Sequence, residues 1–180
     1  MTFDWPHTDA LSLAVLGFVT AQRLVELAYS RRNETHLKTA GGIEHGAAHY
    51  PLMVALHAVW LGALWLAASG RHPHLGWLAV FALLQLLRVW VLATLGPRWT
   101  TRIIVLPGVP PIRSGPYRLM SHPNYAVVTA EIFVLPMAFG LVGLALLFSL
   151  LNAAVLFVRI RAETEALRGA QTTPTGSIET

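Results

Sequence analysis

The chain has 180 residues, of which 54% are hydrophobic and only 12% are charged, whereas a soluble domain carries about 25% charged residues. This composition predicts a single domain that folds in lipid, and the absence of cysteine excludes disulfides, thiolate metal sites and a cysteine nucleophile. The net charge of +4 does not indicate nucleic-acid binding, because the basic residues flank apolar runs instead of forming one stripe.

Apolar runs predict an all-α integral membrane protein with about five transmembrane helices, since about 20 apolar residues cross a bilayer as a helix. The first three runs cover residues 11–27, 52–69 and 75–95. A fourth run, 126–160, is too long for one crossing. Pro136, Gly140 and Gly143 near its middle predict a turn. The last two helices are therefore expected to form a hairpin.

Basic residues predict the orientation, because Lys and Arg favour the cytoplasmic side. The basic residues that the predicted spans place on one side of the membrane are Arg31, Arg32, Lys38, Arg98, Arg102, Arg113, Arg118, Arg161 and Arg168. The opposite side has only Arg71 in its connections. We therefore expect the N-terminus outside and the C-terminus in the cytoplasm. Residues 1–168 are predicted to form the domain, and the polar residues 169–180 a disordered tail.

Two charged residues, Arg88 and Glu131, lie inside predicted spans, where a charge is expensive and usually paired or functional. Both lie about two helical turns below the cytoplasmic end of their helix, and two readings stay open. They form a structural ion pair, or they line a reaction chamber in which Arg88 attracts an acidic acceptor and Glu131 orients or deprotonates it. In the first helix, Arg23 and Glu26 are spaced to pair with each other.

The histidines do not predict a metal site. His45 and His49 would share one face of a helix beside Glu44, but a third ligand is missing and Gly41-Gly42 favours a turn. We expect this segment to be an interfacial loop before the second helix. His57, inside that helix, is expected to be a hydrogen-bonded core residue.

The segment "SGPYRLMSHPNYAVVTAE", residues 114–131, joins a Gly-Pro turn to an apolar helix through two tyrosines and a His-Pro pair. Pro123 suits the first position of that helix, and a helix N-terminus favours an anionic group. The polar residues near the start of this helix also have possible roles that involve no ligand. His122 could simply begin the helix, the tyrosines could be anchors at the membrane interface, and Glu163 could be exposed to solvent.

Together with "LGPRWTTRIIVLPG" before it and "RIRAETEAL" after it, this segment resembles the isoprenylcysteine carboxyl methyltransferase family, which overlaps in pattern with the phospholipid methyltransferases. The resemblance covers about residues 84–167. The segments "RRNETHLK" and "GGIEHGAAHYP" resemble a bacterial branch of the family, some of whose members are associated with polyketide-derived lipids.

The resemblance implies S-adenosyl-L-methionine as cofactor, a lipophilic acceptor that enters from the bilayer, and a bacterial inner membrane with the active site facing the cytoplasm. By motif it assigns cofactor contacts to Arg102, Val109, Pro110, Pro111, Ile112, Tyr117, His122, Pro123, Asn124, Tyr125 and Glu163, and a substrate-side role to Arg159. Two positions depart from the family pattern: Ser121 replaces the arginine usual before His-Pro, and Val109 replaces a histidine found in eukaryotic members.

The sequence therefore predicts methylation of an oxygen on a lipophilic acceptor, with Arg88, Glu131 and Arg159 as catalytic candidates. The acceptor would be a carboxylate, as in prenyl-cysteine, or an enol or phenol of an alkylated polyketide lipid. The alternatives are N-methylation of a phospholipid amine and a non-catalytic membrane subunit that binds lipid.

Overall fold

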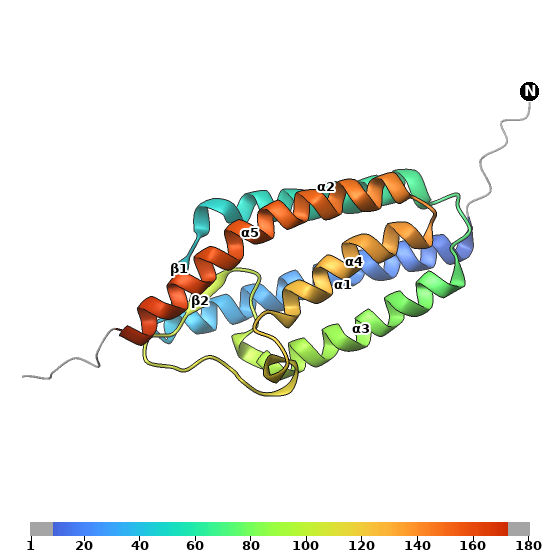
Figure 1. Cartoon of the computed structure of the whole chain (residues 1–180). Helices are drawn as coiled ribbons and strands as arrows, with labels where there is room; N and C mark the ends of the chain where they lie inside the picture. The colour runs from blue at the N-terminus through green and yellow to red at the C-terminus, as the bar shows by residue number, and fades with distance from the viewer. Residues whose placement is uncertain (1–8, 173–180) are drawn as a thin grey trace, which may run out of the picture.

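The computed structural model describes residues 9–172 as a bundle of long helices. The five α-helices of this part of the chain are α1 (Ala10–Thr39), α2 (Tyr50–Ala68), α3 (Leu75–Leu95), α4 (Pro123–Ala138) and α5 (Val142–Thr172). In Figure 1, α2 and α5 run along one side of the bundle and α3 along the other. The shortest helix, α4, packs mainly against α3 and α5.

The predicted third helix and the predicted hairpin are both confirmed. α3 has the predicted bounds, and the long fourth run folds back on itself between Ala138 and Val142. The turn contains Gly140, whose φ of +68° is a left-handed conformation that favours glycine. Pro136 lies inside the last turn of α4, and Gly143 lies inside α5.

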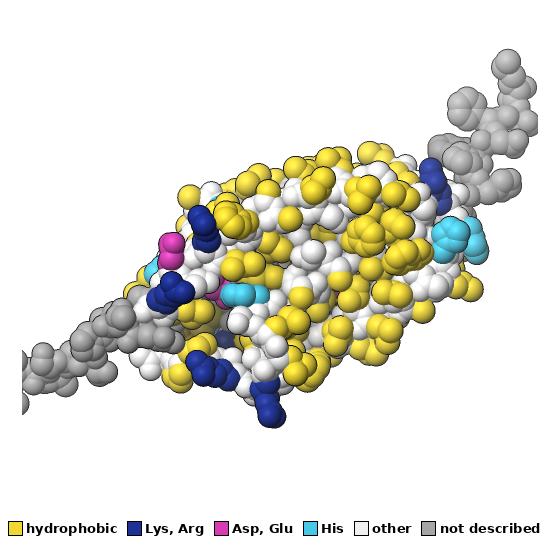
Figure 2. Space-filling view, in the orientation of Figure 1, with side chains coloured by type: hydrophobic (Ala, Val, Ile, Leu, Met, Phe, Trp, Pro, Cys, Tyr) yellow, Lys and Arg dark blue, Asp and Glu magenta, His cyan; other side chains and the backbone are white. Residues whose placement is uncertain are grey.

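The apolar surface identifies an integral membrane protein. In the described residues, four helices (all but α4) are long and apolar enough to cross a membrane. The 21 residues of α3 extend for about 32 Å, close to the roughly 30 Å of a bilayer core. Hydrophobic side chains cover the middle of the face in Figure 2, whereas Lys, Arg and His side chains gather at the two ends.

α1 is longer than the sequence predicted. The expected span ended at residue 27, whereas the helix continues to Thr39. Its polar second half is stabilised by contacts with a connecting loop, because Ser30 and Asn33 are buried there and hydrogen-bonded to it. Arg31, Arg32 and Lys38 therefore lie on the helix and not in a loop after it.

The connections add a small sheet that the all-α prediction missed. β1 (Ile43–His45) pairs antiparallel with β2 (Ile103–Val105), with Glu44 opposite Ile104. Three short 3-10 helices complete the connections: η1 (Ala47–His49), η2 (Gly96–Arg98) and η3 (Gly115–Arg118). Strands of three residues carry too little pattern to be recognised in a sequence.

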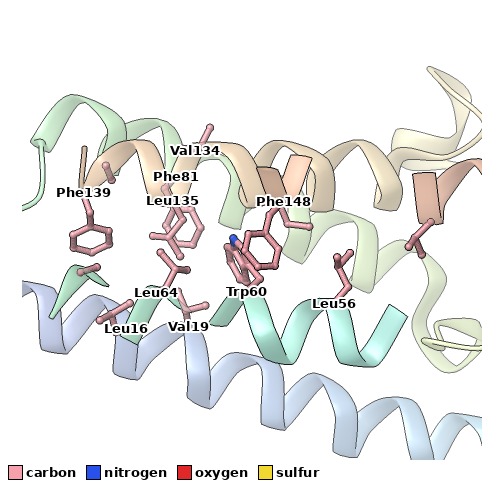
Figure 3. Packing of buried hydrophobic residues seen from close by; sticks show 14 residues of the cluster. Leu16, Val19, Leu56, Trp60, Leu64, Phe81, Val134, Leu135, Phe139 and Phe148 are labelled. Atoms are coloured by element: carbon pink, nitrogen blue, oxygen red, sulfur yellow. The ribbon is translucent and has the colours of Figure 1, made fainter. Parts of the chain in front are cut away.

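The main core lies between the helices, in the part of the bundle away from the sheet. Trp60 and Leu64 of α2 meet Leu135 of α4 and Phe148 of α5, and each is almost or fully buried. Figure 3 shows Leu16 of α1 beside this cluster. This packing stabilises the apolar part of the bundle. The polar connections lie at the opposite end.

The predicted tail requires a correction. Residues 169–172 were expected to be disordered, but they extend α5 to Thr172. Ala170 and Gln171 are good helix formers, and a helix that has already formed adds residues easily. The rest of the predicted tail, 173–180, lies outside the described residues.

Candidate active site

A cavity of about 790 Å³ lies at the polar end of the bundle, between the loop from α3 to α4 and the second half of α5. Its volume is in the usual range for a small-molecule site. The predicted site residues on its wall are Arg102, Val109, Pro111, Ile112, Tyr117, His122, Asn124, Tyr125, Arg159 and Glu163. The motif residues thus gather in one place.

Glu163 contacts two other polar side chains that line the cavity. Tyr125 donates a short hydrogen bond to the Glu163 carboxylate, and His122 Nδ1 lies 3.7 Å from it. The His122 and Tyr125 rings are stacked, with centroids 5.4 Å apart. Among the described residues that line the cavity, Glu163 is the only carboxylate. A bound cation would therefore be attracted to this point of the wall.

Arg159 lies one helical turn before Glu163 on α5 and contributes a positive charge to the same cavity. Its side chain is buried and donates to the Tyr125 hydroxyl, the Thr101 carbonyl and the sulfur of Met53. Within the described residues, no carboxylate lies at ion-pair distance from Arg159. A buried guanidinium without a carboxylate partner attracts an anion.

Two carboxylates fix the position of the Arg102 side chain. It forms ion pairs with Glu34 of α1 and Glu44 of β1, and its guanidinium lies 3.9 Å above the Tyr50 ring. The hydrogen bond from Lys38, followed by the contact with Arg102, lowers the pKa of Glu44 despite some burial. Glu44 therefore stays ionised and keeps Arg102 on the cavity wall.

A tight turn places Tyr117 on the opposite wall. Gly115 has a φ of +53°, and a Cβ there would lie 2.6 Å from the Thr94 hydroxyl of α3, so only glycine lets η3 approach the helix so closely. Burial raises the pKa of Tyr117, and the negative charge of Glu163 raises it further. Tyr117 is therefore a neutral hydroxyl and not a base.

The first part of the α3–α4 loop is fixed by α1. Asn33 donates to the Trp99 carbonyl at 2.7 Å, and the Ser30 hydroxyl accepts from the Thr101 backbone N–H at 2.8 Å. Tyr29 stacks on the Trp99 ring. Because the Thr101 carbonyl accepts from Arg159, α1 indirectly positions that guanidinium.

Arg88 and Glu131 are in contact, but they belong to a larger buried cluster of charged residues that does not line the cavity. Arg88 Nη1 lies 2.5 Å from Glu131 Oε2, and Arg88 also binds Glu26 through two nitrogens. Arg23 bridges the same two carboxylates, at 3.0 Å from Glu26 and 2.7 Å from Glu131. We call Arg23, Glu26, Arg88 and Glu131 the buried charge cluster.

The buried charge cluster joins α1, α3 and α4 and contains two charges of each sign. Glu131 is 0% exposed and also accepts from Gln85 at 2.8 Å. Neither Arg88 nor Glu131 lines the cavity. This geometry favours the first of the two readings, a structural ion pair that holds the helices together.

Two of the predicted cofactor contacts, Pro110 and Pro123, do not line the cavity. The Pro110 carbonyl accepts from Arg98, and Pro123 begins α4.

Several contacts at the site were not predicted from the sequence. The ion pairs of Arg102 with Glu34 and Glu44 were not expected, and neither was the contact of Met53 with Arg159. A weak signal was present for the buried charge cluster, since Arg23 and Glu26 face the same side of α1. In the described residues, no group of three His, Cys, Asp or Glu side chains is arranged to hold a metal ion.

Fold and site together define a class of protein: a helical integral membrane protein with a cavity at the end of its bundle that is lined by both polar and apolar side chains. A sequence profile of the isoprenylcysteine carboxyl methyltransferase family matches residues 77–169, so the chain belongs to that family. Members of the family are membrane methyltransferases, which places this chain in that class of enzyme.

A similar protein of Bacillus subtilis (strain 168), named uncharacterized protein YpbQ, is 39% identical over 159 residues. The match covers 86% of this chain and 95% of the Bacillus protein. It is therefore longer than the segment that the family profile matches and extends into the residues before residue 77. No solved structure matches the chain.

Proposed function

We propose that the chain is an S-adenosyl-L-methionine-dependent methyltransferase that methylates an oxygen of a lipophilic acceptor. The observation that carries this proposal is the placement of Arg159 and Glu163 one turn apart on the same cavity wall. Glu163 provides the negative charge that a cationic cofactor needs. Arg159 provides a buried positive charge that suits an acceptor oxygen bearing negative charge.

The residues present fit the cofactor. Glu163 suits its ammonium group or ribose hydroxyls, and the stacked His122 and Tyr125 rings offer a flat surface for its adenine. Asn124 lines the cavity beside these rings, and within the described residues its buried Oδ1 has no hydrogen-bond partner. When bound, S-adenosyl-L-methionine supplies the methyl group from its sulfonium.

The chain itself contributes position and electrostatics, which is what an in-line displacement requires. Tyr125 links the two halves of the wall, since its hydroxyl donates to Glu163 and accepts from Arg159. An acceptor oxygen near Arg159 would therefore be held beside the cofactor subsite. The acceptor would be a carboxylate of the prenyl-cysteine type, or an enol or phenol of an alkylated polyketide lipid.

Replacing Glu163 with glutamine is expected to weaken S-adenosyl-L-methionine binding by about 1–3 kcal/mol, because a charge-assisted contact is lost while the shape is kept. Titration calorimetry on the detergent-solubilised protein measures this. Glu165→Gln is the matched control, because Glu165 is exposed on the same helix and does not line the cavity. Absence of cofactor binding to the wild type would end the proposal and favour a non-catalytic membrane subunit.

For the orientation, we propose that the cavity faces the cytoplasm, so that cofactor enters from the cytosol. The support is the concentration of Arg and Lys at the cavity end. A reporter fused after residue 180 should read cytoplasmic, and one inserted after Arg71 should read external. A cytoplasmic signal from the Arg71 connection would contradict this orientation.

A further inference from the structure

Residues 113–122, in the connection between α3 and α4, contact the cavity with only some of their side chains. Tyr117 and His122 line the cavity. Leu119 and Met120 do not line it, and they are 78% and 50% exposed. Similar exposure is found for lipid-facing leucines of the spanning helices, for example 73% at Leu150 of α5. An apolar pair exposed this far on a connection indicates contact with another apolar phase.

This part of the connection lies beside the end of a membrane-spanning helix (Figure 1). A Cβ on Gly115 of η3 would lie 3.2 Å from Nε1 of Trp90 on α3. Because α3 ends at Leu95, Trp90 lies about 7–8 Å inside the end of that helix. Its indole is 44% exposed, and Trp is enriched at the boundary between acyl chains and headgroups. The segment therefore reaches the surface of the bilayer.

Two arginines of the same segment suit an anionic partner. Arg113 and Arg118 are exposed and line the rim of the cavity. Within the described residues neither has a carboxylate at ion-pair distance, whereas Arg102 has two. Residues 113–125 contain no Asp or Glu. A guanidinium presents a fork of N–H donors that matches a phosphate, and basic residues at a membrane surface prefer lipids with net negative charge.

We propose that residues 113–120 bind the headgroup of an anionic phospholipid. Arg113 and Arg118 contact its phosphate, while Leu119 and Met120 enter the region of the acyl chains. The lipid is a bound partner and not the methyl acceptor, so the inference does not depend on the proposed function. Because the same segment forms part of the cavity wall, the bound lipid also stabilises that wall.

The first test measures the depth of the segment. The chain has no cysteine, so one spin label can be attached at Leu119→Cys, Leu86→Cys or Thr35→Cys in nanodiscs that contain phosphatidylglycerol. Leu86 is 68% exposed on α3 and is the membrane control, and the exposed Thr35 on α1 is the aqueous control. At Leu119, oxygen should relax the label more than an aqueous nickel chelate does, as at Leu86. Relaxation like that at Thr35 would contradict the inference.

The second test measures which lipid binds. Dioctanoyl-phosphatidylglycerol or dioctanoyl-phosphatidylcholine is titrated into the detergent-solubilised protein, and slower hydrogen exchange of residues 113–122 reports binding. Arg113→Gln with Arg118→Gln should weaken phosphatidylglycerol binding by about 5–30-fold, about fivefold for each basic residue, and change phosphatidylcholine binding little. The matched control is Arg31→Gln with Arg32→Gln, an exposed pair on α1 that does not line the cavity. This control should bind as the wild type does.

Three results would overturn the inference. Equal weakening by both pairs of substitutions would mean a general attraction of the protein to anionic micelles. Equal protection by glycerol phosphate alone would mean an anion site without membrane contact. Unchanged lipid binding with weaker S-adenosyl-L-methionine binding would assign Arg113 and Arg118 to the cavity. Arg113→Lys with Arg118→Lys, which keeps the charge, should retain most of the lipid binding. No readout requires turnover, so absence of methyl transfer would overturn the proposed function alone.

Discussion

Replacing Glu131 with alanine is expected to lower the free energy of unfolding by about 3–5 kcal/mol, because the change leaves a buried charge without its partner. Glu131 is 0% exposed and holds Arg23 and Arg88 at 2.7 and 2.5 Å. Without it, both guanidiniums face Glu26 alone. Thermal and denaturant unfolding of the detergent-solubilised protein measure the loss, with the exposed Glu165→Ala as control.

The double variant Arg88→Leu with Glu131→Leu tests what the buried charge cluster is for. It removes one charge of each sign and leaves Arg23 paired with Glu26. If the cluster only holds the helices together, most of the stability and most of the turnover should return, because apolar groups of similar volume often replace buried ion pairs without loss. A double variant that folds and binds cofactor but has no turnover would instead favour the reaction-chamber reading.

Replacing Arg159 with methionine is expected to reduce kcat/KM by about 10²–10³-fold, the usual loss when one donor to a developing or resident oxyanion is removed. The physical reason is that Arg159 is 4% exposed and has no carboxylate partner within the described residues, so its charge acts on the acceptor without competition. The binding of S-adenosyl-L-methionine should fall much less than it does with Glu163→Gln.

Arg161→Met is the matched control for Arg159→Met. Arg161 lies on the same helix, stacks on the Phe157 ring and does not line the cavity. Steady-state kinetics with a lipophilic acceptor, together with calorimetry for the cofactor, separate the two effects. If Arg159→Met lowers cofactor affinity as strongly as Glu163→Gln but leaves kcat unchanged, Arg159 belongs to the cofactor subsite and not to the acceptor.

The sequence predicted the parts of the fold that follow from hydrophobic length. Residues 75–95 form one helix, and the turn near Gly140 divides a run too long for one crossing. It underestimated α1, because the polar residues after residue 27 look like a loop until the partners of Ser30 and Asn33 are known. Local pattern cannot reveal contacts with residues about 65 positions away along the chain.

The site was predictable where an ordered motif exists, and much less where distant residues meet. Most of the motif residues, from Arg102 to Glu163, line one cavity. The pairing of Arg88 with Glu131 was one of two open readings, but the participation of Arg23 and Glu26 was not foreseen. His57 was expected to be a hydrogen-bonded core residue, and its bond to Met53 is present. Its partial exposure could only come from the three-dimensional arrangement.

The contacts of α1 and β1 with the site have a consequence for chimeras built from this chain and a relative. The family profile begins at residue 77, yet Ser30, Asn33 and Glu44 before that point hold the loop and Arg102 in place. A substitution at Ser30, Asn33 or Glu44 is therefore expected to disturb residues of the loop that lie inside the family profile. A chimera that takes its first two helices from a relative has to import the matching loop as well, or it will inherit a complete motif that is wrongly assembled.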